Sequence, residues 1–162
     1  MPSKKELEKF IFETKPEKAS AKLAINGFMI GSLFLILTLI WTLSPNRFGP
    51  IVIGQLMIAA PLLFVSSLAY AKLGYWRETR LWDTYGWLTN TIGNALIFNA
   101  IGLMTGTIYR GIAIAFFITL ILLMLIYTLI NTRYNPDQAR QKAFKFIFFA
   151  AIILIGGIVP LL

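Results

Sequence analysis

Charged residues divide this chain into long apolar stretches separated by short polar ones. Each apolar stretch is long enough, the last one barely, for a helix to cross the ~30 Å hydrocarbon core of a bilayer, which takes about 20 mainly apolar residues. The charge-free stretches lie between Lys22 and Arg47, Arg47 and Lys72, Asp83 and Arg110, Arg110 and Arg133, and after Lys145. The pattern predicts an all-α polytopic membrane protein, one domain over residues 1–162, with five transmembrane helices. They are expected at about 23–43, 50–71, 87–109, 111–131 and 146–162.

The segment before the first predicted span, residues 1–18, has a different pattern. Leu7, Phe10 and Ile11 recur there at helical spacing among lysines and glutamates. This arrangement predicts a short amphipathic interfacial helix that lies on the cytoplasmic leaflet with its apolar side inserted. A soluble partner or another subunit could cover the same apolar side chains instead.

Two of the predicted spans should depart from regular helix. Pro61 lies in the middle of the second span and cannot donate a backbone hydrogen bond, so a kink or a locally opened turn is expected there. The last span has Gly156, Gly157 and Pro160 in its final turns, which predicts a distorted end.

Composition supports the membrane assignment, and the charges predict an orientation. Hydrophobic residues make up 57% of the chain, and the mean hydropathy is +0.73. Thirteen of the 15 basic residues fall in the N-terminal segment and in alternate loops, whereas only Arg47 and Arg110 fall on the opposite side. The positive-inside rule then places the N-terminus in the cytoplasm and the C-terminus outside. We expect an integral protein of a prokaryotic cytoplasmic (inner) membrane that contacts anionic lipid headgroups, and the net charge of +8 needs no nucleic-acid partner.

Several residue types that membrane enzymes use do not occur in this sequence. It contains no cysteine and no histidine, which excludes thiolate catalysis, disulfides, haem ligation by histidine and the usual zinc sites. Asp83 and Asp137 fall in different predicted loops, so no aspartate cluster for magnesium is expected. The sequence therefore predicts a protein that is not an enzyme, with no cofactor and no metal site.

The third predicted span is the most polar of the five. Asn90 and Asn94 share one side of it with small residues, and Asn99 shares another side with Gly102 and Gly106. Small or polar residues on two sides predict that this helix lies at the centre of the bundle. One interpretation is that the asparagines donate across helices and the glycines permit close packing. The other is that they line a polar pathway or pocket for an uncharged solute, together with Gln55, Thr105 or Thr107.

The loop before that span is rich in aromatic and charged residues, including Trp76, Arg77, Arg80 and Trp82. These side chains are typical of an interfacial segment in which aromatic rings lie at headgroup level and arginines face anionic lipid. A sharper hypothesis is a headgroup or ligand site in which the arginines bind phosphate and Glu78 or Asp83 acts as acid or base. Spacing also allows Arg80 to pair with Asp83 along a helix.

Two functions fit these features. One is a small homo-oligomeric channel or facilitator whose route follows the third span, an interpretation that the proline-broken second span favours. The other is an accessory or scaffold subunit that packs against other subunits of a larger membrane complex. A lipid-headgroup-binding protein or an enzyme fits less well.

Overall fold

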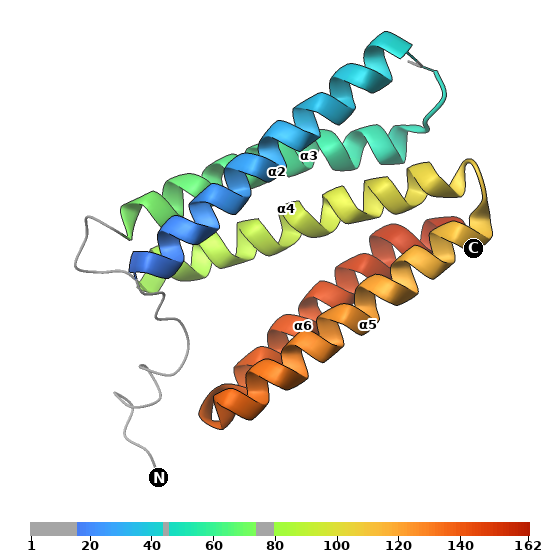
Figure 1. Ribbon diagram of the computed structural model, residues 1–162. Helices are drawn as coiled ribbons and strands as arrows, with labels where there is room; N and C mark the ends of the chain where they lie inside the picture. The colour runs from blue at the N-terminus through green and yellow to red at the C-terminus, as the bar shows by residue number, and fades with distance from the viewer. Residues whose placement is uncertain (1–15, 44–45, 74–79) are drawn as a thin grey trace.

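The structure is a computed structural model that describes residues 16–43, 46–73 and 80–162. Regular structure in this described part is helical throughout, which confirms the predicted all-α class. The long helices are α2 (Pro16–Leu43), α3 (Pro50–Lys72), α4 (Arg80–Gly106), α5 (Arg110–Tyr134) and α6 (Ala139–Ile153) (Figure 1). Short helical segments flank α6: η1 (Pro136–Gln138), a π-helical turn η2 (Leu154–Ile158) and a 3-10 turn η3 (Val159–Leu161).

Four helical stretches of the described chain are long and apolar enough to cross a membrane, namely residues 18–42, 50–72, 110–134 and 136–161. They are compatible with an integral membrane protein and match four of the five predicted spans. The fifth prediction falls on α4, which at 27 residues is about 40 Å long. Because α4 carries Asn90, Asn94 and Asn99 among its apolar residues, it is not one of these four. That the chain crosses the membrane five times thus stays a prediction. The predicted amphipathic segment, residues 1–18, lies mostly outside the described residues.

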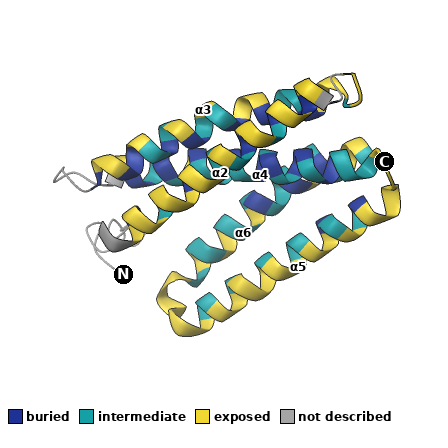
Figure 2. Ribbon diagram, turned by 45° about the horizontal axis from the view of Figure 1, so that its top comes forward, coloured by how far each residue is buried: buried dark blue, intermediate teal, exposed yellow. Residues whose placement is uncertain are grey.

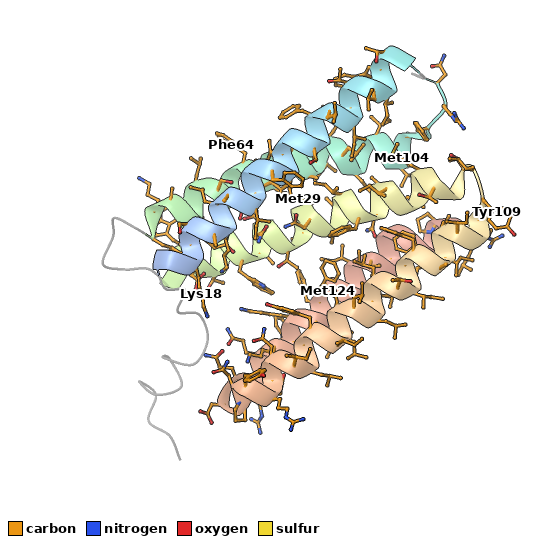
Figure 3. All side chains as sticks on the ribbon, in the orientation of Figure 1. Lys18, Met29, Phe64, Met104, Tyr109 and Met124 are labelled. Carbon is orange, nitrogen blue, oxygen red and sulfur yellow. The ribbon has the colours of Figure 1, made fainter. Side chains whose placement is uncertain are left out.

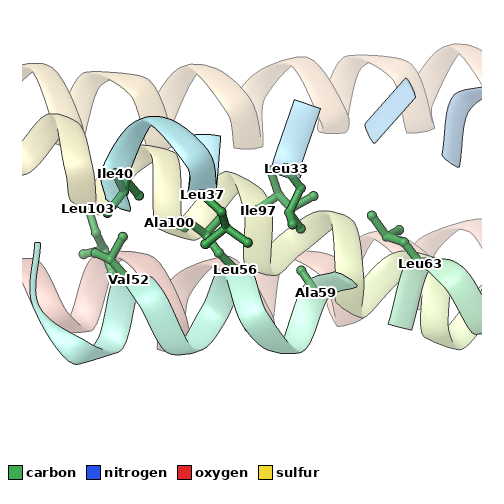
Figure 4. Close-up of a cluster of buried hydrophobic side chains, with 10 residues drawn as sticks. All are labelled: Leu33, Leu37, Ile40, Val52, Leu56, Ala59, Leu63, Ile97, Ala100 and Leu103. Carbon is green, nitrogen blue, oxygen red and sulfur yellow. The ribbon is translucent and has the colours of Figure 1, made fainter. Parts of the chain in front are cut away.

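Helices α2, α3 and α4 pack together around the larger apolar core. Apolar side chains recur every three or four residues on the facing sides of these helices, as a helical interface requires. Figure 4 shows this core, which consists of Leu33, Leu37, Ile40, Val52, Leu56, Ala59, Leu63, Ile97, Ala100 and Leu103. Side chains on the opposite side of α3 point outward, as Phe64 does in Figure 3.

The α5–α6 hairpin contacts the other side of α4 through a second core formed by Ala95, Phe117, Phe149 and Ile153. Since α4 has neighbours on two sides, the prediction that it is the central helix is confirmed. Both ribbon views show the hairpin close to α4 near the C-terminus and diverging from it toward the other end (Figures 1 and 2). Most of α5 is exposed in Figure 2, and only Ala113 and Phe117 of this helix are buried.

Some predicted boundaries were wrong. α4 ends at Gly106, and residues 107–109 form the connection to α5, in which Ile108 and Tyr109 both donate their backbone N–H to the Thr105 carbonyl. Arg110, which was expected in this connection, is instead the first residue of α5.

Two expected irregularities have different outcomes. The distorted end of the last span is confirmed, because a π-helical turn and a 3-10 turn follow Ile153. Pro61 lies inside a helix that is continuous from Pro50 to Lys72, and its ring is exposed, so the irregularity expected there stays a prediction.

Candidate functional site

Polar side chains meet α4 near its first turn in what we call the ion-pair cluster: Lys22, Asn26, Ser66, Tyr70 and Asp83. Asp83 lies in the first turn of α4, where the helix dipole favours a negative charge. Its carboxylate Oδ1 is 3.7 Å from Lys22 Nζ of α2, and the two side chains are 3% and 31% exposed. The Lys22 ammonium also lies 4.5 Å from the centre of the Tyr70 ring, within cation–π range. A nearly buried carboxylate is therefore paired with a lysine that still reaches solvent.

A buried chain of hydrogen bonds continues from this pair and joins three helices. Asn26 Nδ2 of α2 donates to Ser66 Oγ of α3 at 3.0 Å, and Ser66 Oγ donates to the Gly86 carbonyl of α4 at 2.9 Å. Gly86 permits this close approach, because a Cβ there would lie 3.1 Å from the Tyr70 ring. Each bond satisfies a polar group that would otherwise be costly to bury.

Aromatic side chains connect α6 to α4 near the same end, where the two helices diverge (Figure 1). The Trp87 ring lies 6.2 Å from that of Phe144 and 5.6 Å from that of Phe148, centre to centre. Lys145 Nζ lies 5.3 Å from the centre of the Trp87 ring. A second lysine thus accompanies Lys22 near this end of α4.

A second polar group, the amide site, lies further along α4 and consists of Gln55, Asn99, Gly156 and Gly157. Gln55 Nε2 of α3 donates to the Gly156 carbonyl at 2.8 Å, and Asn99 Nδ2 of α4 donates to the Ile152 carbonyl at 3.1 Å. Both acceptors belong to the segment where α6 changes into the π-helical turn η2. Asn99 is fully buried. Such π-helical turns occur frequently at functional sites.

An aromatic side chain closes one side of the amide site. The Phe117 ring of α5 is fully buried between Gly102 of α4 and Gly157 of η2. A Cβ at Gly102 would overlap this ring, and one at Gly157 would lie 2.5 Å from it. The two glycines therefore set the spacing between α4, α5 and η2.

The predicted pathway residues separate into three groups. Gln55 and Asn99 meet at the amide site, whereas Asn94 Nδ2 donates to the Asn90 backbone and side-chain oxygens within α4. Thr105 donates to the Ile101 carbonyl of its own helix. Packing between helices is enough to explain the hydrogen bonds of Gln55 and Asn99, so the role of these residues in a pathway stays a prediction.

The predicted headgroup residues are described only in part. Trp76 and Arg77 lie outside the described residues. Arg80 is the first residue of α4, but its side chain is not described. Trp82 is 38% exposed.

The sequence interpretation missed most of the ion-pair cluster. Asp83 was expected in a loop as a partner of Arg80, but it is buried in α4 beside Lys22. Asn26 and Ser66 were passed over, although isolated polar residues in apolar spans are a recognised sign of interhelical contact. Lys22 was counted only as a basic residue of the N-terminal segment.

These contacts form a membrane-type helical bundle with one ion-pair cluster and one amide site on α4. The chain matches no protein-family model, no curated protein and no solved structure.

Proposed function

We propose that this chain is a small, non-enzymatic, homo-oligomeric channel or facilitator, in which α4 provides the polar lining for an uncharged solute. The observation that supports this proposal is the distribution of polar side chains on α4. Asp83 and the Asn90–Asn94 pair lie on one side of α4 and Asn99 on another, at successive levels over a separation of 16 residues, or about 24 Å. The helices around α4 are apolar enough to span a bilayer. A central polar helix inside an apolar bundle is the arrangement that a polar route requires.

The chemistry of the lining favours passive movement of a neutral solute. Beyond the first turn, the polar residues of α4 are amides and hydroxyls, which exchange hydrogen bonds without changing charge. Coupled transport normally depends on ionisable groups well inside the membrane. The charged members of the described site lie instead near the start of α4: Asp83 is in its first turn, Lys22 contacts Asp83, and Lys145 contacts Trp87.

The orientation belongs to the same proposal. Basic loops assign the end of the bundle with the ion-pair cluster to the cytoplasm and the C-terminus to the outside of a prokaryotic cytoplasmic membrane. Exposed apolar residues of α5 would face lipid acyl chains. Basic residues at the cytoplasmic end would contact anionic headgroups.

An accessory subunit of a larger membrane complex is the second candidate. The observation that favours it is that the Gln55 and Asn99 amides both donate to the backbone of the last span. These amides then act as packing contacts, each worth about 0.6–2 kcal/mol. In that case the exposed apolar side of α5 would be available to another subunit.

Reconstitution of the full chain distinguishes the two candidates. After purification in mild detergent, its mass would be measured, and solute flux would be followed in liposomes. A homo-oligomer that passes a neutral solute supports the facilitator. A chain that passes none and co-purifies with other membrane proteins supports the accessory subunit.

A matched pair of variants connects any flux to α4. Asn94→Leu removes bonds that lie within α4, so the contacts between helices remain while a polar group of the proposed lining is lost. Flux should fall, with little change in thermal stability. Thr128→Val is the control, because Thr128 of α5 also donates only to its own helix, to the Met124 carbonyl. If both variants keep the flux of the parent protein, α4 does not provide the lining.

A further inference from the structure

The amide site presents two buried oxygen atoms with a fixed orientation. Backbone carbonyls only accept hydrogen bonds, so the amide nitrogens of Gln55 and Asn99 must face the carbonyls of Gly156 and Ile152. Their oxygens, Gln55 Oε1 and Asn99 Oδ1, then necessarily point elsewhere. Both oxygens are shielded, and neither accepts a hydrogen bond from the described part of the chain.

Both amides lie beside Gly156, and that of Asn99 also lies beside Gly157. A Cβ built on Gly156 would overlap Asn99 Nδ2 and would lie 3.4 Å from Gln55 Nε2. A Cβ built on Gly157 would lie 2.6 Å from Asn99 Oδ1. The absence of a side chain at both positions therefore makes room for two amide groups beside the π-helical turn.

Two buried acceptors of this kind call for a donor. A buried polar atom without a partner is costly, and native proteins normally satisfy it with protein or with a small bound molecule. In the described part of the chain, Gln55, Asn99 and the two glycines contact backbone carbonyls, each other and the Phe117 ring, all of which are uncharged. A cation would lose its hydration here without a negative charge to compensate for it. A neutral donor carries no charge to bury and needs only the two acceptor oxygens.

We infer that the amide site binds a small neutral molecule that donates hydrogen bonds to Gln55 Oε1 and Asn99 Oδ1. Water is the simplest member of this class, and small amides and polyols such as urea and glycerol share its chemistry. Binding depends only on the two amides, whereas the place of the site on a solute route rests on the proposed function.

Nuclear magnetic resonance tests the binding directly. The full chain, with ¹⁵N in its asparagine and glutamine side chains, would be placed in lipid nanodiscs in plain buffer, where water is the available donor. Nuclear Overhauser effects from long-lived water to the side-chain amides of Gln55 and Asn99 are expected. In Gln55→Met, which removes one acceptor, the effect at Asn99 should weaken. The absence of a water signal at both amides of the parent protein would overturn the inference, even if the protein passes solute.

Stopped-flow flux in liposomes tests the place of the site on a route. Gln55→Met should lower water, urea or glycerol flux by roughly three- to tenfold, the effect of losing one ordinary hydrogen bond. Unchanged flux in this variant would remove the site from the route, while the proposed function would stand. If the parent protein passes nothing but shows the water signal, the proposed function fails, and the site binds a structural water.

Discussion

Replacement of Gly102 by alanine should destabilise the bundle, although alanine is the better helix former. A Cβ at this position would overlap the Phe117 ring, three atoms of which lie within 2.8 Å of it. Phe117 is fully buried and cannot swing into solvent without opening the contact between α4 and α5. Overpacking of this kind costs about 1–3 kcal/mol. At Gly54 of α3 a Cβ would meet nothing within 4 Å, so Gly54→Ala is the matched control.

The measurement is thermal unfolding of both variants in the same detergent. The helix preference of alanine over glycine, up to about 1 kcal/mol, applies to both, so the difference between them isolates the overlap. We expect Gly102→Ala to melt below Gly54→Ala by roughly 2–12 °C, at about 2–4 °C per kcal/mol for a chain of this size. Adding Phe117→Leu should recover part of the loss. Equal melting of the two alanine variants would refute the packing of Phe117 on α4.

Three further predictions concern charge, orientation and the N-terminal segment. Lys22→Met should lower stability more than Asp83→Asn, by about 1 kcal/mol or more in thermal unfolding. The first change leaves a buried carboxylate without this lysine, whereas the second leaves a lysine that reaches solvent. A larger loss in Asp83→Asn would contradict the buried pair. A reporter fused at the C-terminus should be active outside the cytoplasm, and activity only inside would reverse the topology. Replacing Leu7, Phe10 and Ile11 by serine should increase protease access to the N-terminal segment in vesicles without preventing membrane insertion of the spans. Unchanged protection would show that these three side chains do not hold the segment on the membrane surface.

The helices could be predicted well because one simple requirement determines them. A span must carry about 20 residues without uncompensated charge, and the spacing of Arg47, Arg110 and Arg133 shows where each such run ends. Helix ends were less predictable, because they depend on local bonds. At the end of α4, Thr107 Oγ1 donates to the Met104 carbonyl, and the helix ends there, before the next charged residue, Arg110.

Contacts between helices were harder to derive. Periodicity gives the face of α4 on which Gly102 and Gly106 lie, but not the side chains that pack against that face. In the structure, Phe117 packs against Gly102, and Leu161 and Ala113 pack against Gly106. Ala113 is fully buried, whereas Ala115, two positions further along α5, is exposed, a difference that composition alone does not show.

The polar sites could not be assembled from sequence for a related reason. Gln55 and Gly156 are separated by 101 positions, and Asn26 and Ser66 by 40, so no local pattern connects them. Asp83 was misplaced because charge alone was taken to mark a loop. Burial of a carboxylate depends on a partner from another helix, here Lys22, which only the packed structure brings near.

The same contacts explain how a helix as polar as α4 fits a bundle built for lipid. An unpaired amide or carboxylate facing acyl chains would be costly, but a helix with neighbours on two sides can turn such groups inward. The carboxylate of Asp83 meets α2, the carbonyl of Gly86 meets α3, and the amide of Asn99 meets the last span. Each of the three contacts is made to a different neighbouring helix. The polar groups that exclude α4 from the apolar spans therefore also bond it to three of them, beside the two apolar cores that pack α4 against its neighbours, whether or not a solute moves along it.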